Sequence, residues 1–220
     1  MERGLNASKI DVVYNSIDIS KYAKDAGERI RFREQHSLSP DKYVVVGAGS
    51  FVEVKGFHIL IEAFALSVRE NKNLHLLLAG DGPMKCAYLN KIQELGIEDK
   101  VTISPSYVKD IRPWLWAADL FVLPSISEPF GIITLEAMAA NLPVIVSAEG
   151  GPSEVITNYV DGFIVPPSQP HVLSETINHV ASFSQSELDR IIQQLELFGN
   201  KTTADRLIAV YDKVLAEKKS

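Results

Sequence analysis

Apolar residues along the chain fall into short runs that alternate with longer stretches of helical period. The short runs are rich in Val, Ile and Leu and are bounded by Gly, Pro or Asp, which predicts strands buried on both faces. These runs are 12–14, 43–46, 74–79, 101–103, 120–123 and 144–146. Between and after them, apolar residues three or four positions apart predict amphipathic helices. These helical stretches are 28–36, 57–68, 84–95, 110–118, 132–140, 170–183, 186–197 and 202–216. The alternation predicts an α/β fold, a doubly wound, Rossmann-like, mostly parallel sheet of about six strands with helices on both faces.

The most informative stretch runs from Asp119 to Gly151. It contains a predicted strand at 120–123, a polar loop, a predicted helix at 132–140 and the next strand at 144–146. Asn141 can take the left-handed conformation that ends a helix. The polar loop follows the carboxyl end of a parallel strand, which is where open α/β sheets bind ligands.

Two carboxylates flank the start of this predicted helix, Glu128 in the loop and Glu136 in the helix. Gly131 lies between them and lets the backbone come close to a ligand, while the free N–H groups of the first helical turn favour a phosphate. Carboxylates are better suited to accepting hydrogen bonds from hydroxyl groups. A nucleotide sugar carries both kinds of group. From spacing alone a second interpretation stays open, in which Glu128 complements the helix dipole and Glu136 lies on a solvated face.

The stretch resembles the signature of glycosyltransferase family four, the retaining nucleotide-sugar transferases of the GT-B fold. One departure is Asn141, where the family usually has Gly. The matching residues are Glu128, Phe130, Gly131, Glu136 to Ala139, Pro143, Val144, Gly150, Gly151 and Glu154, with further matches at Asn15 to Asp18, Gly80 to Pro83 and Asp161 to Pro167. In the family the last of these is a hairpin-like segment that closes the sheet.

The resemblance implies roles for the residues of the loop and helix. Glu136 would accept hydrogen bonds from the ribose hydroxyls, and Glu128 would accept one from a sugar hydroxyl. The backbone N–H groups of Phe130, Gly131 and Ile132 would meet the sugar and the phosphates. The reaction implied is transfer of a sugar from a UDP-, GDP- or ADP-sugar to an acceptor hydroxyl with retention, in polysaccharide, glycolipid or glycoconjugate synthesis.

The segment from Gly49 to Gly56 resembles the family's diphosphate-binding segment. Lys55 matches the family lysine and would stabilise negative charge on the leaving diphosphate, so Lys55 and Glu128 are the expected catalytic residues. Ser50 stands where the family has Arg. Serine donates a hydrogen bond but cannot neutralise charge, so one cationic contact to the diphosphate is missing.

The resemblance also implies a domain organisation. Residues 1–220 would form a single donor-binding domain, with 1–9 as a residual interdomain linker and 200–217 as a C-terminal helix that packs across the partner domain in the family. By this resemblance the N-terminal acceptor-binding domain would be missing from the 220 residues. We therefore expect weak nucleotide binding and negligible sugar transfer by this chain alone, and an exposed apolar face or a self-association surface on the C-terminal helix.

Composition narrows the partners. The formal net charge of −6 argues against nucleic acid, and no apolar run reaches the length of a membrane span. Cys86 is the only cysteine, which is typical of a reducing compartment. We expect a cytoplasmic protein, with any association with the inner membrane face made through the missing half. No His/Asp cluster has metal-ligand spacing and the family is metal-independent, so neither metal nor cofactor is expected.

Three alternatives remain. A non-catalytic nucleotide-sugar-binding or interaction module acting with a separate partner half is favoured by Ser50 and by the missing domain. A non-hydrolysing sugar epimerase of the same fold would need acid and base groups across the cleft, which this sequence does not place, and the Phe-Gly and Glu-Ala-Met-Ala motifs fit transferases better. A dinucleotide oxidoreductase is disfavoured because the third glycine of its fingerprint would fall at Val52.

Overall fold

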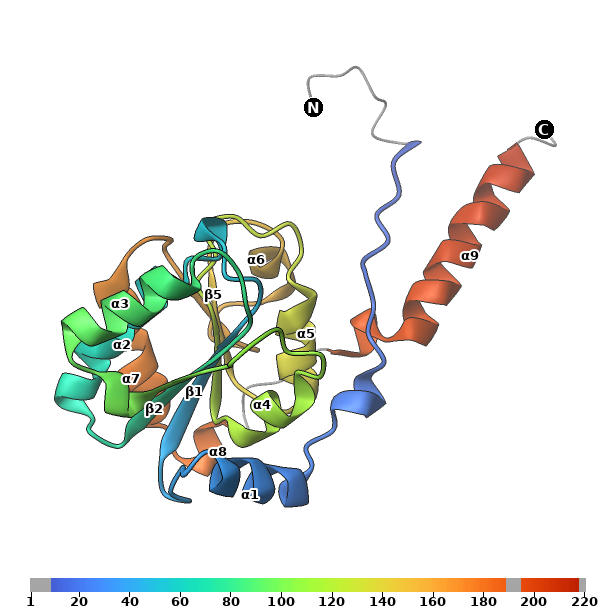
Figure 1. Cartoon of the computed structure of the whole chain (residues 1–220). Helices are drawn as coiled ribbons and strands as arrows, with labels where there is room; N and C mark the ends of the chain where they lie inside the picture. Colours follow the sequence, from blue (N-terminus) through green and yellow to red (C-terminus); the bar gives the residue numbers. More distant parts are fainter. Residues whose placement is uncertain (1–8, 189–194, 218–220) are drawn as a thin grey trace.

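The computed structural model describes residues 9–188 and 195–217, and its centre is a parallel sheet of six strands (Figure 1). The strand order is β3-β2-β1-β4-β5-β6, and each neighbouring pair is parallel. This is the order of a doubly wound Rossmann-like sheet, as the sequence predicted. The strands are β1 (Tyr43–Ala48), β2 (Leu74–Ala79), β3 (Val101–Ile103), β4 (Leu120–Leu123), β5 (Val144–Ser147) and β6 (Phe163–Val165).

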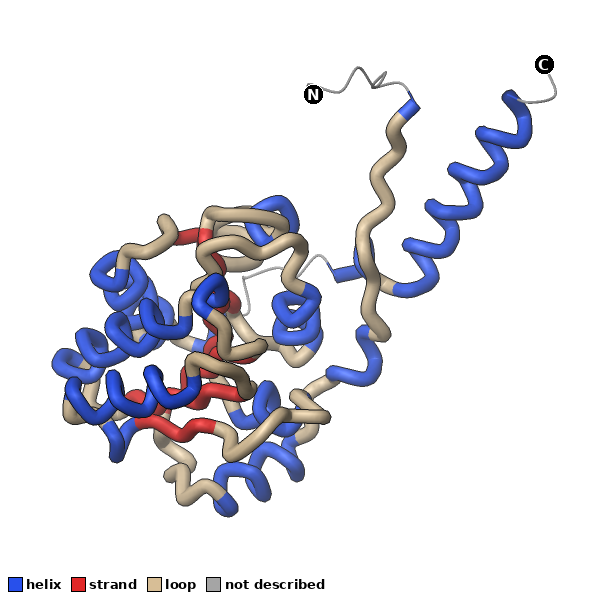
Figure 2. Tube along the Cα trace, turned by 45° about the horizontal axis from the view of Figure 1, so that its top comes forward, coloured by secondary structure: helices blue, strands red, loops and turns tan. Residues whose placement is uncertain are grey.

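Helices cover both faces of the sheet (Figure 2). Because side chains alternate along a strand, Val44 and Val46 of β1 enter one apolar cluster and Val45 enters the other. The first cluster receives α1, α4 and α5, and the second receives α2, α3 and α7. The helices are α1 (Ala26–Gln35), α2 (Phe57–Glu70), α3 (Lys85–Leu95), α4 (Arg112–Ala117), α5 (Ile132–Ala139), α6 (Pro152–Val155), α7 (Pro170–Ala181), α8 (Gln185–Leu188) and α9 (Asn200–Glu217).

The predicted core residues are buried. In α2, Leu60, Ile61 and Phe64 have no exposed surface, and full burial of each such side chain contributes about 1.5–3 kcal/mol to folding. Trp114 and Trp116 are 7% and 8% exposed and lie in the first cluster. They are core residues.

Three sequence predictions of local structure were wrong. Residues 12–14 form no strand; Val12 is 68% exposed because this segment leaves the domain and reaches no edge of the sheet. The segment 161–167 closes the sheet as expected, since it supplies the edge strand β6, but it is not a hairpin: β6 pairs in parallel with β5 after a crossover through α6.

The third concerns 186–197, predicted as one helix. α8 ends at Leu188, 189–194 lie outside the described residues, and Leu195–Phe198 form a 3-10 turn. Leu188 packs against the cluster on one face of the sheet, whereas Leu195 and Phe198 are buried in the cluster on the other face. Because these residues lie on opposite faces of the sheet, Leu188 and Leu195 do not belong to one straight helix.

The segment before α1 and the helix α9 extend from the domain on the same side (Figure 1). Lys213 Nζ lies 3.0 Å from Asp11 Oδ2, which links the two. The apolar face predicted on α9 is exposed, with Ile208 56% and Tyr211 60% accessible. In the described part of the chain, no helix is both long and apolar enough to cross a membrane.

Candidate functional site

The candidate site lies at the carboxyl ends of β1 and β4. β1 leads into α2 on one face of the sheet, and β4 leads into α5 on the other. The two connections therefore separate at this pair of strands and leave a crevice, which is the usual ligand position in a doubly wound sheet. The connection after β1 carries Ser50 and Lys55, and the connection after β4 carries Glu128 and the start of α5. The fold thus brings together the residues that the sequence had singled out.

Lys55 and Glu128 form an ion pair across this crevice. Lys55 Nζ donates to Glu128 Oε2, and the same oxygen accepts from Ser125 Oγ at 3.4 Å. Glu128 is only 6% exposed, so it depends on these donors to offset the cost of removing a carboxylate from water. The sequence assigned the two residues to different parts of a donor molecule and gave no sign that they contact each other.

The first turn of α5 offers unused hydrogen-bond donors. Gly131, at φ 73°, is the residue preceding the helix and supplies no side-chain cap. Within the described residues, the backbone N–H groups of Phe130, Gly131, Ile132 and Ile133 have no acceptor. Such a helix start carries partial positive charge and binds anions.

Two glycines hold the connections around the crevice against one another. Gly56, at φ 66°, packs so tightly on the connection after β4 that an added Cβ would lie 2.2 Å from the carbonyl oxygen of Pro124. Gly150, at φ 95° in the connection after β5, would place a Cβ 2.1 Å from the carbonyl oxygen of Glu128. Any other residue at either position would force two backbones apart. The connections after β1, β4 and β5, which are neighbouring strands in the sheet, are therefore in direct backbone contact.

Glu136 lies on α5 beyond the free N–H groups and is half-buried. Its Oε1 accepts a hydrogen bond of 2.7 Å from the hydroxyl of Tyr22. Tyr22 ends a 3-10 turn, Ile19–Tyr22, that precedes α1. Sequence reasoning missed Tyr22 because nothing in a local pattern connects it with a glutamate 114 positions away.

Two adjoining pockets open beside these residues. The Ser50 pocket has a volume of about 250 Å³ and reaches from Ser50 and Asp81 to Ile133. The Glu136 pocket has a volume of about 300 Å³ and includes Tyr22. Both are lined by Tyr107, Val108 and Ile111.

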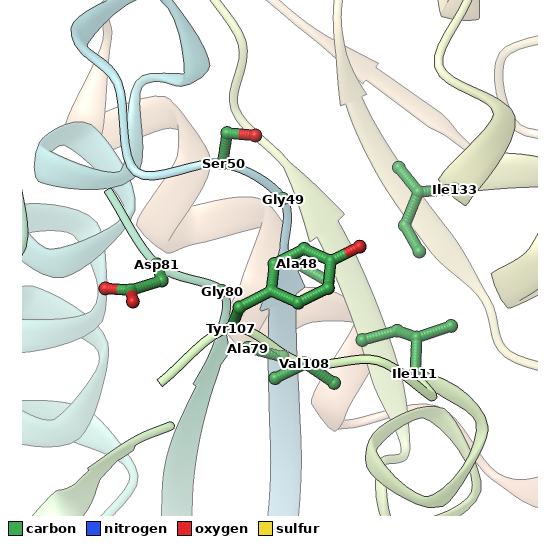
Figure 3. Close-up of a pocket in the computed structure, with 10 residues that line it drawn as sticks. All are labelled: Ala48, Gly49, Ser50, Ala79, Gly80, Asp81, Tyr107, Val108, Ile111 and Ile133. Carbon is green, nitrogen blue, oxygen red and sulfur yellow. The ribbon is translucent and has the colours of Figure 1, made fainter. Parts of the chain in front are cut away.

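Figure 3 shows how the Ser50 pocket is arranged. The Tyr107 ring lies across the ends of β1 and β2, between Ser50 and Asp81 on one side and Ile111 and Ile133 on the other. Tyr107 is 72% exposed, so its ring is accessible to a ligand. Lys55 and Glu128 are not among the residues that line either pocket. The crevice is therefore lined by an ion pair and a row of free N–H groups, and two pockets open beside them.

These features define what the site can bind. The N–H groups and the Lys55 ammonium suit phosphate oxygens, the carboxylates suit hydroxyl groups, and the Tyr107 ring offers a flat surface for a planar group. Among the described residues, no three His, Cys, Asp or Glu side chains gather closely enough to hold a metal ion.

Comparison with known proteins identifies the family of the chain. The family model described as Glycosyl transferases group 1 matches residues 28–196. An uncharacterized glycosyltransferase of Methanocaldococcus jannaschii is 34% identical over 177 residues, covering 79% of this chain and 45% of that protein. The N-acetyl-alpha-D-glucosaminyl L-malate synthase of Bacillus anthracis is 34% identical over 155 residues, covering 70% of this chain and 40% of that protein. The chain thus spans less than half the length of these two relatives.

Solved structures show the same fold. HepE of Anabaena in complex with UDP superposes with a TM-score of 0.86 at 26% identity, covering 96% of this chain and 59% of that one. The C-terminal domain of the group 1 family protein LpcC of Francisella tularensis superposes with a TM-score of 0.72 at 21% identity, covering 82% of this chain and 95% of that domain. With the family match extending from α1 into the turn before α9, the chain belongs to the group 1 glycosyltransferases of the GT-B fold.

Proposed function

We propose that this chain is the donor-binding domain of a retaining, metal-independent glycosyltransferase that takes its sugar from a nucleoside diphosphate sugar. The observation that carries the proposal is the row of free N–H groups at the start of α5, placed between the Lys55–Glu128 ion pair and the carboxylate of Glu136. This order matches the order of groups in the ligand, in which a diphosphate joins a sugar to a ribose.

In this proposal the diphosphate binds the N–H groups of Gly131, Ile132 and Ile133 and recruits Lys55. The ammonium of Lys55 then stabilises the negative charge that develops on the leaving diphosphate. Donor binding competes with Glu128 for Lys55, and Glu128, once released, accepts a hydrogen bond from a sugar hydroxyl. Ser50, which lines its pocket and is exposed, donates one hydrogen bond where the family supplies a charge.

Glu136 takes the ribose hydroxyls, and the pockets on either side of Tyr107 receive the remaining parts of the nucleotide. A solved neighbour in complex with UDP makes uracil the first base to test, ahead of guanine and adenine. Acceptor binding belongs to an N-terminal domain outside these 220 residues, and that domain would also make any contact with the inner face of the membrane. The complete enzyme is proposed to act in the cytoplasm.

Calorimetric titration of the purified chain with UDP, GDP and ADP, and with their glucose, mannose and N-acetylglucosamine conjugates, tests this proposal. We expect one base to bind, and Glu136→Ala and Lys55→Ala each to weaken that binding about tenfold or more. Lys91→Ala is the matched control. Lys91 also forms an ion pair, with its Nζ 2.7 Å from Glu62 Oε1, but it does not belong to the crevice. The control is expected to bind like the unmodified chain.

A well-folded chain that binds none of these nucleotides would contradict the proposal. It would favour an interaction module that works with a separate partner half. The observation behind this second candidate is the exposed apolar face of α9, on which Ile208 and Tyr211 are more than half accessible.

A further inference from the structure

The hydroxyl of Tyr22 donates a hydrogen bond to one of the two carboxylate oxygens of Glu136. The bond to Oε1 is 2.7 Å long, and both residues line the Glu136 pocket. Within the described residues, Oε2 of Glu136 accepts no hydrogen bond from the protein. One oxygen of this carboxylate is therefore fixed, and the other is available to a ligand.

Tyr22 is itself held in place. The indole Nε1–H of Trp116 donates to the carbonyl oxygen of Tyr22 at 2.9 Å, and Trp116 is buried under α1 and the 3-10 turn. The backbone of Tyr22 thus rests on the core, while its hydroxyl reaches the site. A donor fixed in this way costs little conformational entropy when a ligand binds.

The Tyr22 hydroxyl keeps its proton under all ordinary conditions. Burial, together with the hydrogen bond to Glu136 and the charge of that residue, raises the pKa of Tyr22 above its usual value. The hydroxyl consequently donates to the carboxylate and never competes with it as an anion.

We propose that Tyr22 is a positioning residue for Glu136, fixing Oε1 so that Oε2 is oriented to accept a ribose hydroxyl. The inference rests on the proposed function, because it assumes that Glu136 binds ribose. It adds a residue from the N-terminal segment to the specificity of a site that is otherwise built from connections that follow strands of the sheet.

The test compares UDP with 2′-deoxy-UDP and 3′-deoxy-UDP by calorimetry. We expect the unmodified chain to prefer UDP over at least one deoxy form by about tenfold, the effect of one hydrogen bond to a charged group. Tyr22→Phe keeps the ring and removes only the hydroxyl. We expect it to weaken UDP binding about fivefold and to reduce the preference to about twofold, because the carboxylate is free to rotate.

Tyr14→Phe is the matched control. Tyr14 lies in the same segment, its ring packs edge-on against Phe198 at 5.6 Å, and its hydroxyl has no hydrogen-bond partner in the described part of the chain. We expect this variant to keep the full preference for UDP. Glu136→Gln completes a double-mutant cycle, and in that background Tyr22→Phe should change the preference much less.

Each other outcome overturns the inference. If Tyr22→Phe weakens UDP and the deoxy forms equally, the hydroxyl has only a structural role. Unchanged or tighter UDP binding would mean that Tyr22 blocks Oε1 rather than orients Oε2. An unmodified chain that does not distinguish UDP from either deoxy form would also overturn the inference. A chain that binds GDP or ADP in place of UDP is compared with the deoxy forms of that nucleotide. Failure of the proposed function looks different, since the unmodified chain would then bind none of UDP, GDP and ADP, and the inference would fall with it.

Discussion

Lys55 and Glu128 depend on each other before any ligand arrives. Lys55→Ala would leave a buried carboxylate with only a long contact from Ser125. Such a group costs about 1–3 kcal/mol, so we expect the free energy of unfolding in urea to fall by that amount. Replacing the carboxylate as well, in Lys55→Ala with Glu128→Gln, should restore part of the loss. A double variant as unstable as the single one would contradict this account.

At the residue level, the sequence singled out candidate residues of the crevice but not the contacts between them. Ser50, Lys55, Glu128 and Glu136 were singled out because a family signature identifies residue types at fixed spacing. The bond from Tyr22 to Glu136 joins residues 114 positions apart and depends on how the N-terminal segment packs, which no local pattern records. Ser125, the second donor to Glu128, was missed for the related reason that serine in a polar loop gives no signal.

His75, in the paired strands β2 and β3, lies in an environment that should make the stability of the protein depend on pH. His75 on β2 contacts Thr102 Oγ1 on β3 through Nε2 at 2.9 Å. Burial, reinforced by the nearby positive charges of Lys42 and Lys100, lowers the pKa of His75 to about 4. The folded state thus binds the proton less readily than the unfolded state does.

Stability should therefore be fully present above about pH 6.5 and should fall as the pH drops toward about 4, by about 2–3 kcal/mol from this one residue. His75→Gln should remove this part of the pH dependence, as measured by urea unfolding at pH 7 and pH 4.5. The exposed His171 is the control, and His171→Gln should leave the pH dependence unchanged. An identical acid loss in His75→Gln would refute the assignment.

Elements were predicted well where a period was long and were missed where tertiary context decides. α2 is amphipathic over 14 residues and was predicted within two residues of its end. Residues 12–14 have the composition of a strand, but a strand needs a partner edge, and this segment lies away from the sheet. Likewise, the apolar residues of 186–197 have helical spacing, yet they belong to opposite faces of the sheet.

At the level of the whole molecule, the proposed function assigns this chain the donor alone and places the acceptor site in another domain. Sugar transfer requires an acceptor hydroxyl held close to the anomeric carbon, and positioning of this kind accounts for much of enzymatic rate enhancement. We expect the chain to show no turnover above background when it is incubated with the sugar conjugate of the base it binds. The measurement is release of free nucleoside diphosphate with simple sugar acceptors, with Lys55→Ala as the background. Turnover that Lys55→Ala abolishes would show that this chain alone suffices.

The backbone contacts made by Gly56 and Gly150 also bear on how such a domain diverges. Because three connections press directly on one another, insertion or reshaping of one of them would displace the other two. Under the proposed function, new donor preferences would therefore be acquired more easily by exchanging side chains on a fixed backbone than by remodelling loops. Exposed positions such as Ser50 and Tyr107 are the natural places for that exchange, and they are where a library of variants aimed at a different nucleotide sugar should concentrate.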